Sequence, residues 1–144
     1  MRPSTILLSA TLAIGCSTLC AAAEPAACPD TIAVRQELAA AVEGWTPTLD
    51  DTPHRLAGIT FYDGPPQERA SLVSDRTTKA AGKETAVWHF KPQANRQIFV
   101  ACSYATTAII LTKPLPPKTA SCSVTYSLQT RVAGLPVIEK IACK

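Results

Sequence analysis

The placement of six cysteines constrains the fold of this chain more than any other feature of its sequence. Three of them lie in one short stretch near the N-terminus, at Cys16, Cys20 and Cys28. The other three lie in the second half of the chain, at Cys102, Cys122 and Cys143. Because disulfides persist chiefly in oxidising compartments, the cysteines that the working protein keeps also indicate where it functions.

The first residues have the pattern of a secretory signal peptide. Arg2 supplies a positive charge, and residues 5–15 form an apolar run that is shorter than the roughly 20 residues that span a bilayer. Small side chains follow at the positions that signal peptidase reads, so we predict cleavage after Ala23. The expected organisation is a signal peptide at 1–23 and a single exported domain at 24–144, periplasmic or secreted, with no transmembrane segment.

A second cleavage site remains open. Residues 12–16 are similar to a loose lipobox, in which Cys16 is lipidated and the product is a lipoprotein. This cut keeps Cys20 and leaves an odd number of thiols, whereas the cut after Ala23 leaves an even number. The even count favours Ala23 and predicts two disulfides among the remaining cysteines, which are Cys28, Cys102, Cys122 and Cys143.

We predict that Cys102 pairs with Cys122 and that Cys28 pairs with Cys143. The first two residues lie on the apolar faces of predicted strands, and the other two lie near the ends of the mature chain, which are often close in a domain. A flat three-stranded meander would hold Cys102 and Cys122 too far apart for a bridge. The pairing therefore requires a sheet that folds over itself.

Alternating apolar residues and frequent prolines predict a fold made of short strands. The 12 prolines interrupt helices and central strands. The run at 106–112 is continuous and β-branched, which predicts a central strand buried on both sides. A helical turn is expected within 67–75 and a polar loop at 75–84. Other strands are predicted at 31–38 (which also suits a helix face), 56–66, 85–90, 97–104, 121–127 and 137–143.

The predicted fold class is therefore mainly β, with a β-rich α+β arrangement as the alternative. Six to seven short, mostly antiparallel strands are expected to form a folded-over sheet, a small barrel or a sandwich, linked by disulfides.

Several short motifs are spread along almost all of the predicted mature chain. They are Cys28-Pro29, Gly44-Trp45, His54-Arg55-Leu56, Phe61-Tyr62-Asp63-Gly64-Pro65-Pro66, Leu72-Val73, Trp88-His89-Phe90, Cys102-Ser103-Tyr104, Leu115-Pro116 and Cys122. In this pattern the chain resembles a family of small exported proteobacterial proteins of unassigned function. The resemblance implies an exported, cysteine-bearing domain and carries over no catalytic residue.

The densest polar cluster in the sequence contains Asp50, Asp51 and His54. A histidine near carboxylates is typical of a general base or a metal ligand, so the alternative function is a small hydrolase or metal-dependent enzyme using His54 with Asp50 or Asp51. The sequence lacks a G-x-S-x-G nucleophile motif, and the only other histidine is His89. Asp and Thr next to Pro53 favour a turn. We therefore predict no catalytic residue, no metal and no cofactor.

The remaining features favour a non-catalytic binding protein. Without Arg2, the chain has 13 basic and 11 acidic residues. The resulting net charge of +2 gives no support for nucleic-acid binding. Trp88 is expected in the core. A possible recognition surface consists of Trp45, His54, Tyr62, Asp63, Pro65 and Pro66. We predict an inhibitor, an immunity-type protein or an envelope accessory protein, whose partner is another envelope or secreted protein. The oligomeric state stays open.

Overall fold

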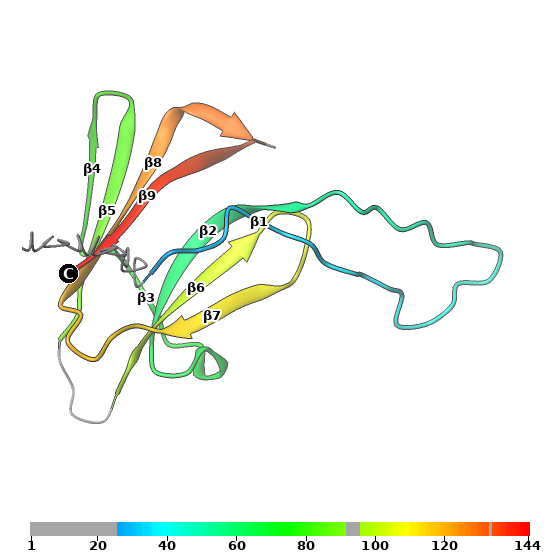
Figure 1. Ribbon diagram of the computed structural model, residues 1–144, viewed down its shortest axis with the longest axis horizontal. Coiled ribbons are helices and arrows are strands. Elements are labelled where there is room, and N and C mark those ends of the chain that lie inside the picture. Colours follow the sequence, from blue (N-terminus) through cyan, green and yellow to red (C-terminus); the bar gives the residue numbers. More distant parts are fainter. Residues whose placement is uncertain (1–25, 92–95, 133) are drawn as a thin grey trace, which may run out of the picture.

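The computed structural model describes residues 26–91, 96–132 and 134–144 (Figure 1). The predicted signal peptide, the cut after Ala23 and the lipidation at Cys16 lie outside the described residues. Within them, the chain forms two antiparallel sheets and a 3-10 turn, η1 (Pro66–Glu68). None of the described residues belongs to a helix of the length and apolarity that crossing a membrane requires.

The first sheet has the strand order β1-β2-β6-β7, and β3 pairs with β2. Its strands are β1 (Thr31–Ile32), β2 (His54–Asp63), β3 (Ser71–Leu72), β6 (Ile98–Tyr104) and β7 (Ile110–Pro114). The second sheet has the order β4-β5-β8-β9. Its strands are β4 (Arg76–Ala80), β5 (Lys83–His89), β8 (Ser121–Val132) and β9 (Leu135–Cys143). The predicted mainly β, antiparallel fold is confirmed.

Side chains from both sheets meet in one apolar core. Phe61 on β2 packs against Trp88 on β5, with ring centroids 5.0 Å apart, and against Phe90 at 5.4 Å. Phe61, Val100 and Val124 are fully buried, and Trp88 is buried as predicted. Tilted aromatic pairs at such distances add to the stabilisation from buried apolar area. This core holds the two sheets together as a sandwich.

Residues 106–112 do not form the central strand that we predicted. β7 begins at Ile110, pairs only with β6 among the described strands, and all its residues are exposed. β7 is the last strand of its sheet, because the other side of β6 is already paired with β2, and Pro114 lies at the end of β7, as is typical of edge strands. A β-branched run thus indicates a strand but does not reveal how many neighbours that strand will have.

The predicted polar loop at 75–84 is instead a β-hairpin. β4 and β5 are joined by Ala81 and Gly82, whose φ angles are 48° and 73°. Two central residues with positive φ make the tight turn whose twist matches that of paired strands. Lys79 Nζ and Glu84 Oε2 lie 3.0 Å apart across the hairpin. The exposed residues of β4 thus belong to an edge strand.

The predicted disulfide pairing is wrong. All four cysteines are bridged, but Cys28 pairs with Cys102 and Cys122 pairs with Cys143. Cys122 on β8 lies directly opposite Cys143 on β9, with Cα atoms 4.1 Å apart. Cys102 belongs to the other sheet and meets the segment that precedes β1. Each bridge therefore fastens residues to one sheet, because the neighbours of a strand decide which thiols can meet.

Candidate protein-interaction site

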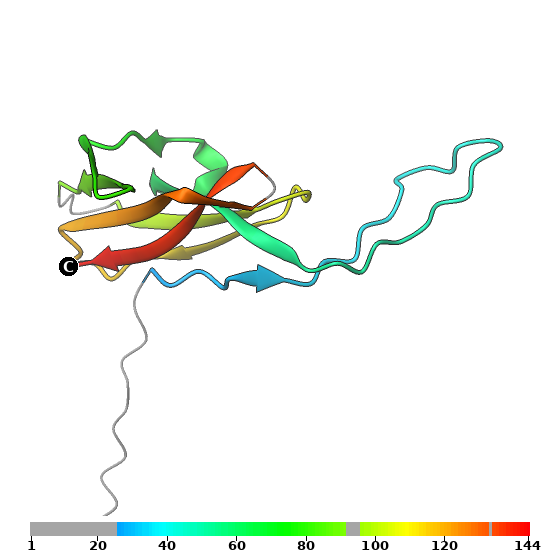
Figure 2. The ribbon, with the colours of Figure 1, turned by 90° about the horizontal axis from the view of Figure 1, so that it is seen from above.

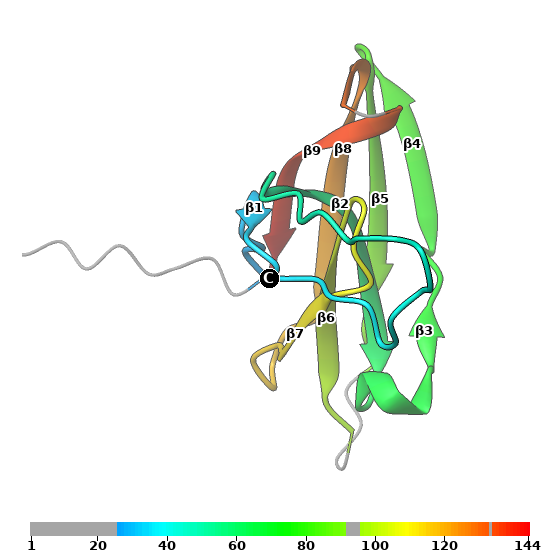
Figure 3. The same ribbon diagram turned by 90° about the vertical axis from the view of Figure 1, so that its right-hand side faces the viewer.

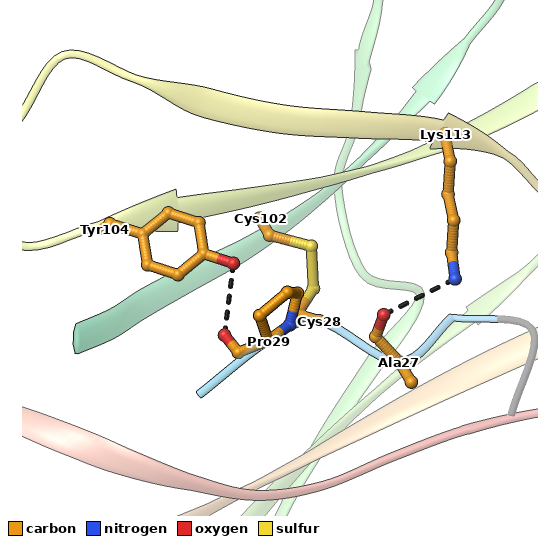
Figure 4. Close-up of a disulfide and its surroundings, with 6 residues drawn as sticks. All are labelled: Ala27, Cys28, Pro29, Cys102, Tyr104 and Lys113. Atoms are coloured by element: carbon orange, nitrogen blue, oxygen red, sulfur yellow. Dashed lines mark hydrogen bonds between the residues drawn. A yellow bond between two sulfur atoms is a disulfide. The ribbon is translucent and has the colours of Figure 1, made fainter. Parts of the chain in front are cut away.

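The segment before β1 is clamped onto the first sheet (Figure 4). The disulfide from Cys28 reaches Cys102 on β6, and the hydroxyl of Tyr104 donates a hydrogen bond of 3.1 Å to the Pro29 carbonyl. On the neighbouring strand, Lys113 Nζ donates a hydrogen bond of 3.4 Å to the Ala27 carbonyl. One covalent link and two hydrogen bonds thus fix residues 27–29 in place.

This clamp leads into a short pair of strands. The amide of Leu56 donates to the Asp30 carbonyl at 2.8 Å, and Ile32 on β1 lies opposite His54 on β2. The connection between these strands, residues 33–53, extends away from both sheets (Figures 1 and 2). In Figure 3 it points towards the viewer, in front of the strands. We call residues 33–53 the arm, and residues 26–32 with 54–144 the body.

The arm carries large apolar side chains that face solvent. Trp45 is 78% exposed, and more than half of the area of each of three others is accessible. These three are Leu38, Val42 and Leu49. None of the four belongs to the core cluster of described residues. A group of exposed large apolar residues is typical of a surface that binds another molecule.

A tight turn in the middle of the arm places Trp45. Its amide donates a hydrogen bond of 3.1 Å to the Val42 carbonyl, and Gly44 between them has a φ of 78°. A side chain at this φ is strained even though open space surrounds the position, so the turn requires glycine for its backbone conformation. The turn therefore holds the backbone immediately before Trp45 in a conformation that glycine permits.

A second turn forms the base of the arm. The Asp50 carboxylate accepts hydrogen bonds from the Thr52 hydroxyl at 2.6 Å and from the Thr52 amide at 2.9 Å. These hydrogen bonds lower the pKa of Asp50. This side chain is thereby engaged in local backbone structure.

His54 is buried at the start of β2, only 7% exposed. Its Nδ1 lies 2.8 Å from the Ala105 carbonyl and 2.9 Å from the Thr106 hydroxyl. Because a carbonyl oxygen can only accept, Nδ1 carries the proton and donates it there. Nε2 is buried and has no hydrogen-bond partner among the described residues. The turn after β6 thus positions the histidine, and no hydrogen bond among the described residues joins it to Asp50 or Asp51.

Two cavities meet at His54. One, of about 450 Å³, lies between the start of β2 and the β8–β9 hairpin, and its lining includes Leu56, Leu135 and Ile138. The other, of about 420 Å³, lies against the base of the arm. The described residues contain no group of three His, Cys, Asp or Glu side chains placed to hold a metal ion. The geometry is therefore that of a hollow lined by both polar and apolar residues, beside a projecting loop.

The structure divides the predicted recognition residues between two places. Trp45 lies on the arm and His54 at its base. Tyr62, Asp63, Pro65 and Pro66 lie at or beyond the other end of β2, which is ten residues and so roughly 30 Å long. There, Arg96 Nε donates to Asp63 Oδ1 at 3.0 Å and stabilises the turn. Sequence reasoning did not identify Leu38, Val42 and Leu49 as exposed residues. The available signal was Gly44, Pro47 and Pro53, which interrupt helices and strands in this segment.

The fold and this site together define a disulfide-linked β-sandwich with an exposed apolar arm, an arrangement suited to binding another protein. A model of the family described as "Type VI secretion system Tli immunity protein" matches residues 51–144, more than half of the chain. The chain therefore belongs to this family of immunity proteins and is a non-catalytic interaction module. The immunity-type binding function predicted from the sequence is confirmed.

The chain is also similar to a small bacterial protein of comparable length. The uncharacterized 16.3 kDa protein in the trpG 5′ region of Azospirillum brasilense is 28% identical over 131 residues, and the match covers 87% of each chain. No solved structure matches this chain. The resemblance seen in the sequence motifs carried no function, and the family match supplies an immunity role.

Proposed function

We propose that this protein neutralises one secreted effector protein by binding it in the periplasm, without chemical turnover. The observation that carries the proposal is the match of residues 51–144 to the Tli immunity family. The two disulfides support an oxidising compartment. Burial of His54 against the Ala105 carbonyl, rather than a pairing with Asp50 or Asp51, gives no support to the alternative hydrolase.

Export is proposed to follow cleavage after Ala23. The first described residue, Ala26, is fully buried, and Cys28 is bridged, so a cut at Ala23 leaves both residues in the mature chain. Intact mass of the exported protein tests this proposal. The expected mass begins at Glu24, whereas a mass that includes a diacylglyceryl group on Cys16 would identify a lipoprotein.

A competition between sister cells tests the immunity function. A strain that lacks this protein is co-cultured with its parent, and with a parent whose type VI secretion system is inactivated. We expect the deletion strain to lose viability only beside the active parent, and the full-length chain to restore survival. A chain without residues 1–23, held in the cytoplasm, should not restore it. Equal survival of the deletion strain beside both parents would contradict the proposal.

A further inference from the structure

We propose that the arm is the element that enters the partner, with Trp45 as its anchor, and that the receiving surface is an apolar cleft with a basic rim on the effector protein. This inference rests on the proposed function, because it names the surface through which that binding occurs.

The exposed apolar residues of the arm have no role in the core. Trp45, Leu38, Val42 and Leu49 are each more than half exposed, and the core cluster of the described residues includes none of them. Tryptophan is enriched among the interface residues that contribute most to binding, especially where it fills a pocket. Burying these apolar side chains against a partner removes their surface from water and so favours binding.

The shape of the arm calls for a concave partner surface. It extends from the body as a loop with both ends held at one place (Figures 1 and 2). The Cys28–Cys102 bridge, the pairing of β1 with β2, and the Asp50 turn fix those ends. Fixed ends lower the entropy lost on binding, and a projecting loop buries most of its area when it enters a cleft.

The net charge of the arm is the reason for proposing a basic rim around the partner's cleft. The arm contains one basic residue, Arg35, and four acidic ones, Glu37, Glu43, Asp50 and Asp51, for a net charge of −3. The rest of the predicted mature chain then has 12 basic and 7 acidic residues, a net charge of +5. A cleft with a basic rim is attracted by the arm and repelled by the body, so charge favours approach through the arm.

The range of the family match is consistent with this division. It begins at residue 51, after the apolar residues of the arm, and covers β2 to β9 of the body. The matched range thus holds the sandwich that supports the arm, and the part of the arm that carries Trp45 precedes it.

The sister-cell competition, with the active parent as probe, tests the arm directly. The test variant carries Val42→Ser, Trp45→Ala and Leu49→Ser. The matched control is Val73→Ser, because Val73 is 87% exposed but lies on the body. We expect the amount of variant needed for half-maximal survival to rise by about 30-fold or more, the effect of losing a strong interface residue. The control variant should protect as well as the wild-type chain. Both variants should have the melting temperature of the wild-type chain.

A second variant tests the charge. Glu37→Lys with Glu43→Lys changes the arm from net negative to net positive, and we expect it to protect less well, with the loss increasing at low ionic strength. Full protection by either arm variant, made at the normal level, would overturn the inference and leave the immunity function intact. If the deletion strain is itself insensitive to its parent, the proposed function fails and the inference fails with it.

Photo-crosslinking separates the possible occupants of the arm surface. A benzoylphenylalanine at position 45, compared with one at position 73, is irradiated in the co-culture. We expect position 45 alone to link to one protein that the active parent secretes, and excess wild-type chain to compete. A link from position 45 to the body of the same chain, or to a second copy, would overturn the proposal.

Discussion

The arm and the body differ in what happens to their apolar side chains, which form a buried core in the body and are largely exposed on the arm. In the body, Phe61, Val100 and Val124 are removed from solvent completely, and a disulfide fastens each sheet. In the arm, no residue is buried, and Trp45 is 78% exposed. We therefore expect stability to reside in the body and recognition in the arm, so mutations should separate the two properties.

Matched aromatic truncations give the sharpest test of this separation. Phe61→Ala should lower the free energy of unfolding by about 3–5 kcal/mol, because it removes a fully buried ring that contacts Trp88 and Phe90. Trp45→Ala should change it by no more than about 0.5 kcal/mol. Denaturant unfolding of both variants measures the difference. Similar losses would show that the arm packs on the body.

The two disulfides should contribute unequally. The chain-entropy model gives roughly 4 kcal/mol for Cys28–Cys102, which are 74 residues apart, and roughly 3 kcal/mol for Cys122–Cys143, which are 21 apart. Replacing each pair with serine and measuring unfolding in urea tests the order. Loss of Cys28–Cys102 should also impair protection, because it releases the clamp at the arm. Loss of Cys122–Cys143 should impair protection only in proportion to stability.

His54 lies at the boundary of the two regions, and its replacement should have an intermediate effect. His54→Ala should leave the fold intact but cost about 1 kcal/mol, because it removes one hydrogen bond to the Ala105 carbonyl, which still accepts from the Thr106 hydroxyl. Thermal unfolding measures the cost, and His54→Gln, which keeps an N–H donor, is the control. We expect protection by His54→Ala to follow its stability. A complete loss of protection by a stably folded variant would point to a direct role for the cavity.

The smallest expected difference between the two regions is in how their carboxyl groups change the melting temperature at low pH. The Asp75 carboxylate in the body accepts the His89 amide at 2.6 Å, and this hydrogen bond lowers the pKa of Asp75. A carboxyl whose pKa is lower in the folded state stabilises the fold above its unfolded pKa, and the contribution is lost as the pH falls through the folded pKa. The melting temperatures of wild type and Asp75→Asn should therefore converge in acid.

Asp50 in the arm serves as the comparison for Asp75 in the body. Its pKa is also lowered, by hydrogen bonds from Thr52, but those bonds connect residues of the arm only. Asp50→Asn should therefore leave the melting temperature unchanged across the same pH range. A pH-dependent shift as large as that of Asp75→Asn would show that folding of the arm is coupled to that of the body.

Local patterns in the sequence predicted much of the body. The alternation in residues 97–104 and 121–127 indicated β6 and the first part of β8, and both strands lie where they were expected. An even cysteine count predicted two bridges, and Trp88 was placed in the core. These predictions succeeded because side-chain alternation reports the conformation of the residues that carry it.

The tertiary structure decided which segments became neighbours. Cys122 meets Cys143 because β8 and β9 pair, and β7 is exposed because it joins the first sheet at its edge. The arm became a projection because β1 and β2 pair at its base and leave the residues between them without a sheet to cover. The sequence by itself determined the strand conformation of segments such as 97–104 and 121–127, and the number of bridges. The thiol partners, the burial of His54 and the exposure of Trp45 depend on contacts between residues far apart in the chain, which no local pattern encodes.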